Sequence, residues 1–308
     1  HGHGIIANFD DRRVATEIRG LDIPIVGVGG GYGWHDPASG IPYIYTDNAA
    51  IGRAGAEHLL SCGFEHLAFY GYPRTATSGW SRERAQAFAA ACRDAGRACA
   101  VFTGRHGTAR RWEDLQRELT AWIGPLPRPM GVMACNDVRA RHVLEACRTL
   151  GLRVPHDVAV LGVDNDEMIC ELTDPPLSSI DQAARRIGYE AAAALDRLMT
   201  GAHGGGRGRR AAASSMRTVI PPIGVVARAS TDTMATNEEA VARALQSLRE
   251  QPWHKPDVGA IASEACVSRS TLEKRFKAVV GRTIHEEFVR IRLTGVRRLI
   301  ADTDLPLK

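Results

Sequence analysis

The feature of this sequence that most restricts its fold is the alternation of short apolar runs with longer amphipathic stretches over about the first 230 residues. Residues 23–29, 131–135 and 158–163 are apolar almost throughout, which predicts strands that are buried on both faces. Residues 80–95 and 138–150 carry apolar side chains at helical spacing and predict helices. Strands of this kind joined by helices indicate an α/β fold with parallel sheets.

A further helix is predicted over residues 47–60, because both of its ends are marked in the sequence. Asp47 is a suitable N-cap, Ile51 and Leu59 belong to one apolar stripe, and Gly63 follows as a terminator. Beyond residue 200, residues 203–217 are rich in glycine and arginine, which predicts a solvated loop before a strand at Val219 and Ile220. An arm that binds nucleic acid is the alternative for this loop.

Composition restricts the class of protein. The chain of 308 residues is 44% hydrophobic and 24% charged, as in ordinary globular proteins, and it has no apolar run long enough to cross a membrane. Its seven cysteines are an odd number without CxxC pairs, which argues against a disulfide framework or a zinc site. The first residues lack a secretory signal pattern, and a strand-like run begins almost at once. We therefore expect a cytoplasmic protein without metal, cofactor or membrane partner, and a sequence that starts inside its first domain.

Polar side chains follow several of the predicted strands. Asp10, Asp137 and Asp164 each come just after an apolar run, and Asn165 follows the last of them. Ligands of α/β folds bind at the carboxyl ends of strands, so these residues predict a shared polar cleft. The alternative for any one of them is an N-cap of the next helix, a position that favours Asp and Asn.

Strand-end carboxylates also suit catalysis, so an enzyme is a second hypothesis. The sequence contains no phosphate loop of the GxxxxGK[ST] type, no HExxH and no GxSxG, and its glycines after Val28 do not form a convincing GxGxxG. We therefore expect that the chain is not an enzyme.

The last quarter of the chain differs from the rest. From Asn237 onward the pattern is purely helical, and residues 236–308 carry 13 Lys and Arg against 10 Asp and Glu, which is a net charge of +3. The remaining 235 residues have a net charge of only +1, because 26 Lys and Arg face 25 Asp and Glu there. This distribution favours a polyanionic partner for the helical part.

Two short helices within this part are joined by a compact turn. Asp257 caps residues 258–264, residues 265–268 form the turn, and residues 269–280 form a second helix that ends at Gly281. This is the helix-turn-helix arrangement. The apolar positions that hold the pair together are predicted to be Ile261, Ala262, Val267, Leu272 and Phe276.

The second of these helices is the predicted DNA reader. Arg269 and Lys277 suit phosphates, whereas Glu273 and Lys274 suit base edges. The alternative is a basic surface helix that only packs on its neighbour. The complete outward face consists of Arg269, Ser270, Thr271, Glu273, Lys274 and Lys277.

Residues 267–277, 281–285 and 287–293 resemble the first helix-turn-helix and the connecting helix of the AraC family. In that family two such units are joined by a long helix. The resemblance implies a connecting helix over residues 284–300 and places residues 303–308 at the start of a second unit, which the sequence does not complete.

The preceding part resembles the sugar-binding domain of LacI and galactose-repressor type regulators, which has the type I periplasmic-binding-protein fold. The order of sensor and AraC-type module is that of the xylose operon activators, or XylR-like regulators. The resemblance implies a sensor over residues 1–230, a linker over 231–237 and a DNA-binding domain over 238–308. The matching phrases are residues 4–11, 24–30, 46–48, 137–142, 162–165 and 177–180.

In the sugar-binding family an arginine early in the second lobe and acidic or amide residues at strand ends hold the ligand. The matching positions are Arg84, Asp137 and Asp164, with Asp10, Trp80 and Asn165 as weaker candidates. A carboxylate can accept hydrogen bonds from sugar hydroxyls, and a guanidinium donates as a fork. For Arg84 the alternative is an ion pair on the helix surface.

The resemblance as a whole implies a sugar-responsive transcription regulator, with activation of a pentose operon of the xylose type as the expected output. Its partners would be double-stranded DNA, a monosaccharide effector, a second copy of the chain in a homodimer and, for an activator, RNA polymerase. The alternatives are a regulator that senses another small carbohydrate, or a transport sugar-binding protein.

Overall fold

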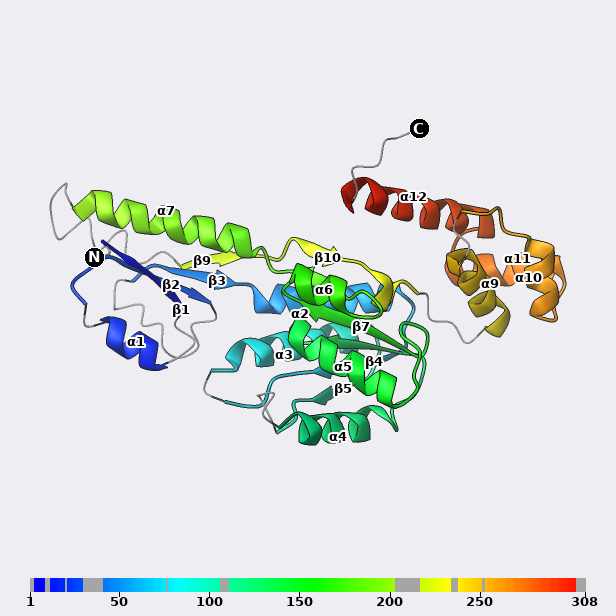
Figure 1. Cartoon of the computed structure of the whole chain (residues 1–308), viewed down its shortest axis with the longest axis horizontal. Helices are drawn as coiled ribbons and strands as arrows, with labels where there is room; N and C mark the ends of the chain where they lie inside the picture. The colour runs from blue at the N-terminus through cyan, green and yellow to red at the C-terminus, as the bar shows by residue number, and fades with distance from the viewer. Residues whose placement is uncertain are drawn as a thin grey trace. The chain divides into compact units, whose positions relative to one another are not determined.

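The computed structural model describes residues 3–8, 12–19, 21–29, 41–75, 77–105, 111–202, 217–233, 238–250 and 253–302. The chain divides into two compact units, which we describe separately. The first consists of residues 1–61 and 65–232, and the second of residues 62–64 and 233–308. All described strands belong to the first unit, whereas the described part of the second is helical apart from its turns (Figure 1). No helix among the described residues is long and apolar enough to cross a bilayer.

One sheet of the first unit is four-stranded and parallel, in the order β1-β2-β3-β9. Helix α7 (Ala184–Ala202) lies along it (Figure 1) and packs its Ala191 and Ala194 against Val26, Ile44 and Ile220 of the strands. Helix α1 (Arg12–Arg19) contacts β1. The strands are β1 (Ile5–Asn8), β2 (Ile25–Gly29), β3 (Tyr43–Thr46) and β9 (Arg217–Ile220).

The other sheet is six-stranded, in the order β10-β8-β7-β6-β4-β5. Its strands are β4 (His66–Tyr70), β5 (Cys99–Phe102), β6 (Met130–Ala134), β7 (Val158–Val163), β8 (Ser178–Asp181) and β10 (Gly224–Val226). Five of them are parallel, as predicted, whereas β10 pairs antiparallel with β8. The reason is the path of the chain, because β8 leads toward the four-stranded sheet and β10 leads back from it.

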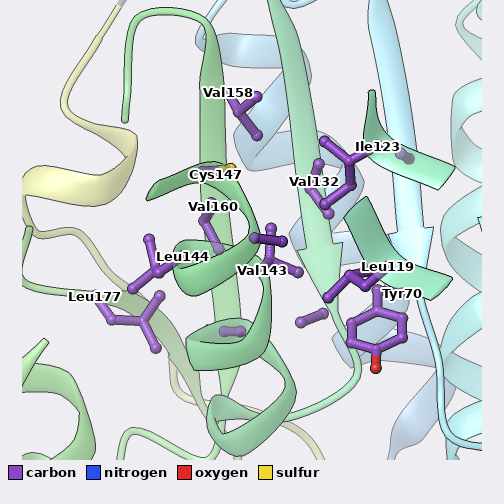
Figure 2. Packing of buried hydrophobic residues seen from close by; sticks show 14 of the residues in the cluster. Tyr70, Leu119, Ile123, Val132, Val143, Leu144, Cys147, Val158, Val160 and Leu177 are labelled. Atoms are coloured by element: carbon purple, nitrogen blue, oxygen red, sulfur yellow. The ribbon is translucent and has the colours of Figure 1, made fainter. Parts of the chain in front are cut away.

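Helices cover both faces of the six-stranded sheet. On one face α5 (Asp137–Thr149) lies over β6 and β7 (Figure 2), with Val143, Leu144 and Cys147 against Val132 and Val160. Helix α4 (Trp112–Ile123) extends this layer with Leu119. Helices α2 (Asn48–Ser61) and α3 (Gly79–Asp94) pack on each other and on the strands. Every residue of β6 and β7 is buried, which confirms the prediction drawn from their apolar runs.

The predicted N-cap of α2 is confirmed, and the helix itself begins and ends one residue later than predicted. The Asp47 side chain accepts a hydrogen bond from Ala50 N at 2.8 Å, and Gly63 has a φ of 84°, a left-handed conformation that suits glycine. Helix α3 begins and ends one residue earlier than predicted, with Gly96 at a φ of 71° after it. The glycine-rich segment lies outside the described residues except for Arg217, which begins β9 rather than ending a loop.

The chain passes between the two sheets three times, at residues 46–48, 181–184 and 220–224. Backbone hydrogen bonds tie these crossovers together, from Asp47 N to Ile220 O at 3.0 Å and from Ile223 N to Asp181 O at 2.9 Å. Main-chain bonds of this kind do not depend on which side chains are present. The crossovers therefore form one connected segment between the sheets.

The second unit contains α9 (Glu239–Glu250), α10 (Val258–Glu264), α11 (Arg269–Val280) and α12 (Ile284–Asp302). Its core combines Leu245 of α9, Ile261 of α10 and Phe288 of α12 with the buried face of α11. Leu272, Phe276 and Val280, one helical turn apart, make up that face. Ile261, Ala262, Val267, Leu272 and Phe276 all belong to this cluster, as predicted.

Candidate functional site

Arg84 lies on the buried side of α3 and is only 4% exposed, so the alternative of a surface ion pair is wrong. Its Nε donates to Asn48 Oδ1 at 2.8 Å, and one terminal nitrogen donates to the Cys135 carbonyl at 2.6 Å. The other terminal nitrogen donates to Gln182 Oε1 at 3.2 Å. Three hydrogen bonds from different segments thus fix the plane of the guanidinium group.

Two of these partners, Asn48 and Gln182, were missed by sequence reasoning. Asn48 is 2% exposed and lies at the end of the first crossover, and Gln182 lies in the second. A single amide side chain has no spacing signal of its own, so only the fold reveals that both meet Arg84. Through them, the arginine is bound to the segment that connects the two sheets.

Asp164 follows β7 and faces Arg84. Its Oδ1 lies 4.0 Å from an Arg84 terminal nitrogen and accepts a hydrogen bond from Gln182 Nε2 at 3.0 Å. The pKa of this carboxyl is raised to about 7, mainly by burial. The Arg84 charge opposes the rise, whereas the charges of Asp137 and Asp166 add to it. The side chain is still 35% exposed, so its carboxylate can be reached by a ligand. The backbone there has a φ of 117°, which is strained for a residue other than glycine.

Asp137 lies behind this carboxylate and is 1% exposed. One of its oxygens accepts from Ser179 Oγ at 2.6 Å, and the other accepts from Asp166 N at 2.9 Å. Burial raises the pKa of Asp137, while these hydrogen bonds oppose the shift. A Cβ at Gly162 would overlap Asp137 Oδ1, so the absence of a side chain at Gly162 makes room for the carboxylate. Asp137 thus holds the loop that carries Asp164.

The weaker candidates differ in position. The half-buried Trp80 lies one turn before Arg84, whose guanidinium carbon is 4.9 Å from the centre of the indole ring. Asn165 follows Asp164, and its Oδ1 accepts a hydrogen bond from Arg228 at 3.0 Å. Asp10 lies outside the described residues. The structure therefore brings Trp80, Arg84 and Asp164 together, with Asn165 beside them.

Two polar residues next to the predicted ones are helix N-caps. Asn136 accepts from Arg139 N at 2.9 Å and caps α5, and Asp166 accepts from Ile169 N at 3.2 Å and caps α6 (Glu167–Leu172). Asp137 and Asp164 have other roles. Among the described residues there is no group of three or more His, Cys, Asp and Glu that could hold a metal ion.

In the second unit, α11 presents a polar and charged face opposite its apolar one. Lys274 and Lys277 are exposed, and Arg269 Nε donates to Glu273 Oε1 at 2.9 Å in a solvent-exposed ion pair. Because surface ion pairs are worth little, the members of this pair can exchange partners readily. The Arg269, Ser270, Thr271, Glu273, Lys274 and Lys277 side chains predicted to read DNA are thus on the exposed or half-exposed side of this helix.

The cap at Asp257 and the end of α11 at Gly281 are as predicted, and Ser268, predicted as part of the turn, also caps α11. Asp257 accepts from Gly259 N and Ala260 N, Ser268 accepts from Thr271 N at 3.2 Å, and Gly281 has a φ of 76°. Ser268 Oγ also contacts Ser270 Oγ at 3.1 Å, so part of the polar face supports the cap. Helix α12 begins at the predicted residue, whereas residues 303–308 lie outside the described residues.

Comparison with known families gives two matches. Residues 1–49 match the XylR N-terminal domain, and residues 56–231 match the periplasmic binding protein-like domain. Together the two matches cover most of the two-sheet unit and leave only residues 50–55, within α2, between them.

Related proteins match over almost the entire chain. The xylose operon regulatory protein of Escherichia coli K12 is 35% identical over 306 residues, which are 99% of this chain and 76% of the relative. The protein of the same name in Haemophilus influenzae is 34% identical over 305 residues, with the same shares. Among solved structures, that of the xylose-binding transcription activator xylR has a TM-score of 0.70 at 35% identity, covering 97% of this chain and 76% of that one.

Proposed function

The chain belongs to the family of xylose operon regulatory proteins, and on that premise we propose that it is a sugar-responsive, DNA-binding activator of a pentose operon. Its relatives are transcription regulators, and the chain belongs with them rather than with the enzymes of the α/β class. The effector would be a monosaccharide, with a pentose of the xylose type as first choice and another small carbohydrate as the alternative.

The observation that carries the sensor assignment is the pairing of a fixed guanidinium with a reachable carboxylate. Arg84 is held by three hydrogen bonds, while Asp164 is 35% exposed and has a pKa raised to about 7. A sugar hydroxyl that donates to Asp164 would replace water at this carboxylate and stabilise its ionised form. An arrangement fixed before the ligand arrives lowers the entropic cost of binding.

The remaining candidates take different parts in this proposal. Trp80 offers an apolar surface to the C–H groups of a sugar ring, and Asn165 and Asp10 are further possible contacts. Asp137 acts through the loop, because both of its oxygens already accept hydrogen bonds from the protein. Sugar binding would draw the two sheets together about the crossovers and select one of two states of the regulator.

Calorimetric titration with D-xylose, L-arabinose and D-ribose tests the sensor site. We expect Asp164→Ala to weaken the binding of the preferred pentose by about 30-fold or more, since a hydrogen bond to a charged group is worth about 2 kcal/mol. Glu167→Ala is the matched control, because Glu167 is an exposed acid in the adjacent helix and its removal changes the charge equally. Equal affinity in wild type and Asp164→Ala would reject the site.

For the second unit we propose an AraC-type helix-turn-helix in which α11 enters the major groove. The exposed Lys274 and Lys277, the capped turn at Ser268 and the buried face of α11 support this assignment. The proposed domains are the sensor at residues 1–230, the linker at 231–237 and the DNA-binding domain at 238–308. The connecting helix of such a module would correspond to α12.

We further propose that the chain acts in the cytoplasm as a homodimer and, as an activator, contacts RNA polymerase. Two-fold symmetric dimers bind paired half-sites, which is the common arrangement for helix-turn-helix regulators. Sedimentation of the free protein and of its complex with an operator duplex would measure the stoichiometry directly. A single copy on a complete operator would reject the dimer.

A further inference from the structure

The segment at residues 227–233, where the first unit passes into the second, contains no large apolar side chain and is held by buried hydroxyl groups. Ser230 and Thr231, in the short helix η3 (Ala229–Thr231), are 0% and 2% exposed. Ser230 Oγ donates to Val160 O at 2.6 Å and accepts from Ser178 N at 2.8 Å. Thr231 Oγ1 lies 2.7 Å from Ser178 Oγ. Hydrogen bonds depend on distance and angle more steeply than apolar contacts do, so this attachment responds to small shifts of β7 and β8.

Arg228 joins this segment to the loop that carries Asp164. Its Nε forms an ion pair with Glu171 Oε1 of α6 at 2.6 Å, and one terminal nitrogen donates to Asn165 Oδ1 at 3.0 Å. The same nitrogen donates to Leu177 O at 3.1 Å, and the side chain is only 10% exposed. One guanidinium thus bridges Asn165, the residue after Asp164, with α6 and with Leu177, the residue before β8.

The loop itself is in a strained conformation that its neighbours maintain. Asp164 and Asn165 have φ values of 117° and 53°, in a region that residues other than glycine rarely adopt. Asn165 N donates to Ser179 Oγ at 3.0 Å, and Asp137 accepts from Asp166 N. Arg228 holds the Asn165 side chain. A backbone held this way can relax when a new hydrogen bond forms at Asp164.

We infer that Arg228 is a positioning residue that couples the occupancy of Asp164 to the conformation of residues 228–233, the segment that leads in the sequence to the helical unit. The inference rests on the proposed function, because it takes Asp164 as the group that meets the sugar. A sugar bound at Asp164 shifts Asn165, the next residue in the chain. Arg228 moves with the Asn165 side chain that it holds, and the hydrogen bonds of Ser230 and Thr231 in η3 change as a result.

Hydrogen–deuterium exchange of the whole chain tests this coupling first without any sugar. The probes are the Ser230 amide, which donates to Pro176 O at 2.9 Å, and the Asp166 amide, which donates to Asp137. Asn165→Gly removes the side chain that Arg228 holds while suiting the φ of 53°. We expect it to accelerate exchange at Ser230 about fivefold or more, because the Asn165 side chain is joined to this segment through Arg228.

Arg228→Lys keeps the charge but cannot span Glu171, Asn165 and Leu177 together. We expect it to accelerate exchange at both Asp166 and Ser230. Arg153→Lys is the matched control, because Arg153 forms a comparable fork with Asp157 at 3.0 and 2.7 Å elsewhere in the same unit. An unchanged Ser230 amide in Asn165→Gly, or a change at Ser230 alone in Arg228→Lys, would overturn the inference.

Addition of D-xylose gives the second readout. In the wild type the sugar should change exchange at both probe amides. In Arg228→Lys we expect an affinity for D-xylose within about threefold of the wild type, because the sugar still binds at Asp164. We expect the sugar to change amide exchange at Asp166 only, because the coupling to Ser230 is lost. A sugar-dependent change at Ser230 that persists in this variant would also overturn the coupling. Failure of the wild type to bind any pentose would instead reject the proposed function, and the sugar-free comparison would still decide the role of Arg228.

Discussion

The proposed sensor site around Arg84 and the proposed DNA-reading face of α11 are built in opposite ways. Arg84 and Asp137 are almost completely buried, and their polar atoms are bound by other parts of the protein. Lys274 and Lys277 project from a helix whose other face alone belongs to the core. Removing the partner of a buried ion lowers the free energy of unfolding strongly, whereas removing the partner of an exposed ion lowers it little. Recognition and stability are therefore coupled at the first site and separable at the second.

The largest effect is expected at Arg84. Arg84→Ala removes the donor that binds Asn48 Oδ1, the Cys135 carbonyl and Gln182 Oε1, and it removes the positive charge beside Asp164, so the free energy of unfolding should fall by about 3–5 kcal/mol. Arg82→Ala, on the exposed side of the same helix, should stay within about 0.5 kcal/mol of wild type. Urea unfolding of both variants measures the difference. Equal losses would show that the comparison between buried and exposed charges does not hold here.

A smaller loss is expected at Gly162. In Gly162→Ala the new methyl group overlaps Asp137 Oδ1, and the carboxylate must leave its partners, which should cost about 1–3 kcal/mol. Gly188→Ala is the control, because Gly188 lies in α7 with nothing near the added atom. This change should stabilise the protein by about 0.5–1 kcal/mol. Thermal unfolding distinguishes the two signs.

Asp164 makes a pH-dependent contribution. Its pKa is about 7 in the folded chain against an ordinary 3.8, so between these values the folded protein holds a proton that the unfolded chain has released. The stability contributed by Asp164 is therefore present at low pH and lost as pH rises toward 7. The unfolding free energy of the wild type relative to Asp164→Asn, whose amide does not titrate, should therefore fall as pH rises over this range. A difference independent of pH would contradict the raised pKa.

The smallest effect on stability is expected for Lys274→Ala, which should change the free energy of unfolding by less than about 0.5 kcal/mol. In a DNA-binding assay, however, it should alter the preference among operator sequences more than it alters the dependence of binding on salt. Lys277→Ala should do the reverse, because we assign it to phosphates. A uniform loss across all operators in Lys274→Ala would contradict its role in reading bases.

Sequence reasoning was most successful where one physical requirement dominates. The apolar runs of β6 and β7, the cap at Asp47 and the helical spacing of Leu272 and Phe276 were all readable, because burial and capping act locally. The antiparallel β10 was not anticipated, since its direction follows from the third crossover rather than from its own residues.

The candidate site was predicted less completely than the fold. Arg84 and Asp164 were named in advance, but Asn48 and Gln182 were not, because they come from crossovers whose meeting point depends on the whole topology. The position of Asp137 past a strand did not reveal that its carboxylate would turn inward. That depends on the space left by Gly162, which lies in another strand.

The backbone hydrogen bonds between the crossovers have a consequence for how such a sensor can diversify. Because the bonds at Ile220 O and Asp181 O are made by main-chain atoms, substitutions around Asp164 leave them intact. Selection or engineering can thus change which sugar is recognised without changing the connected segment formed by the three crossovers. A library confined to the neighbours of Asp164 and Trp80 would search new effectors while every member keeps the connecting segment about which we propose the sheets to close.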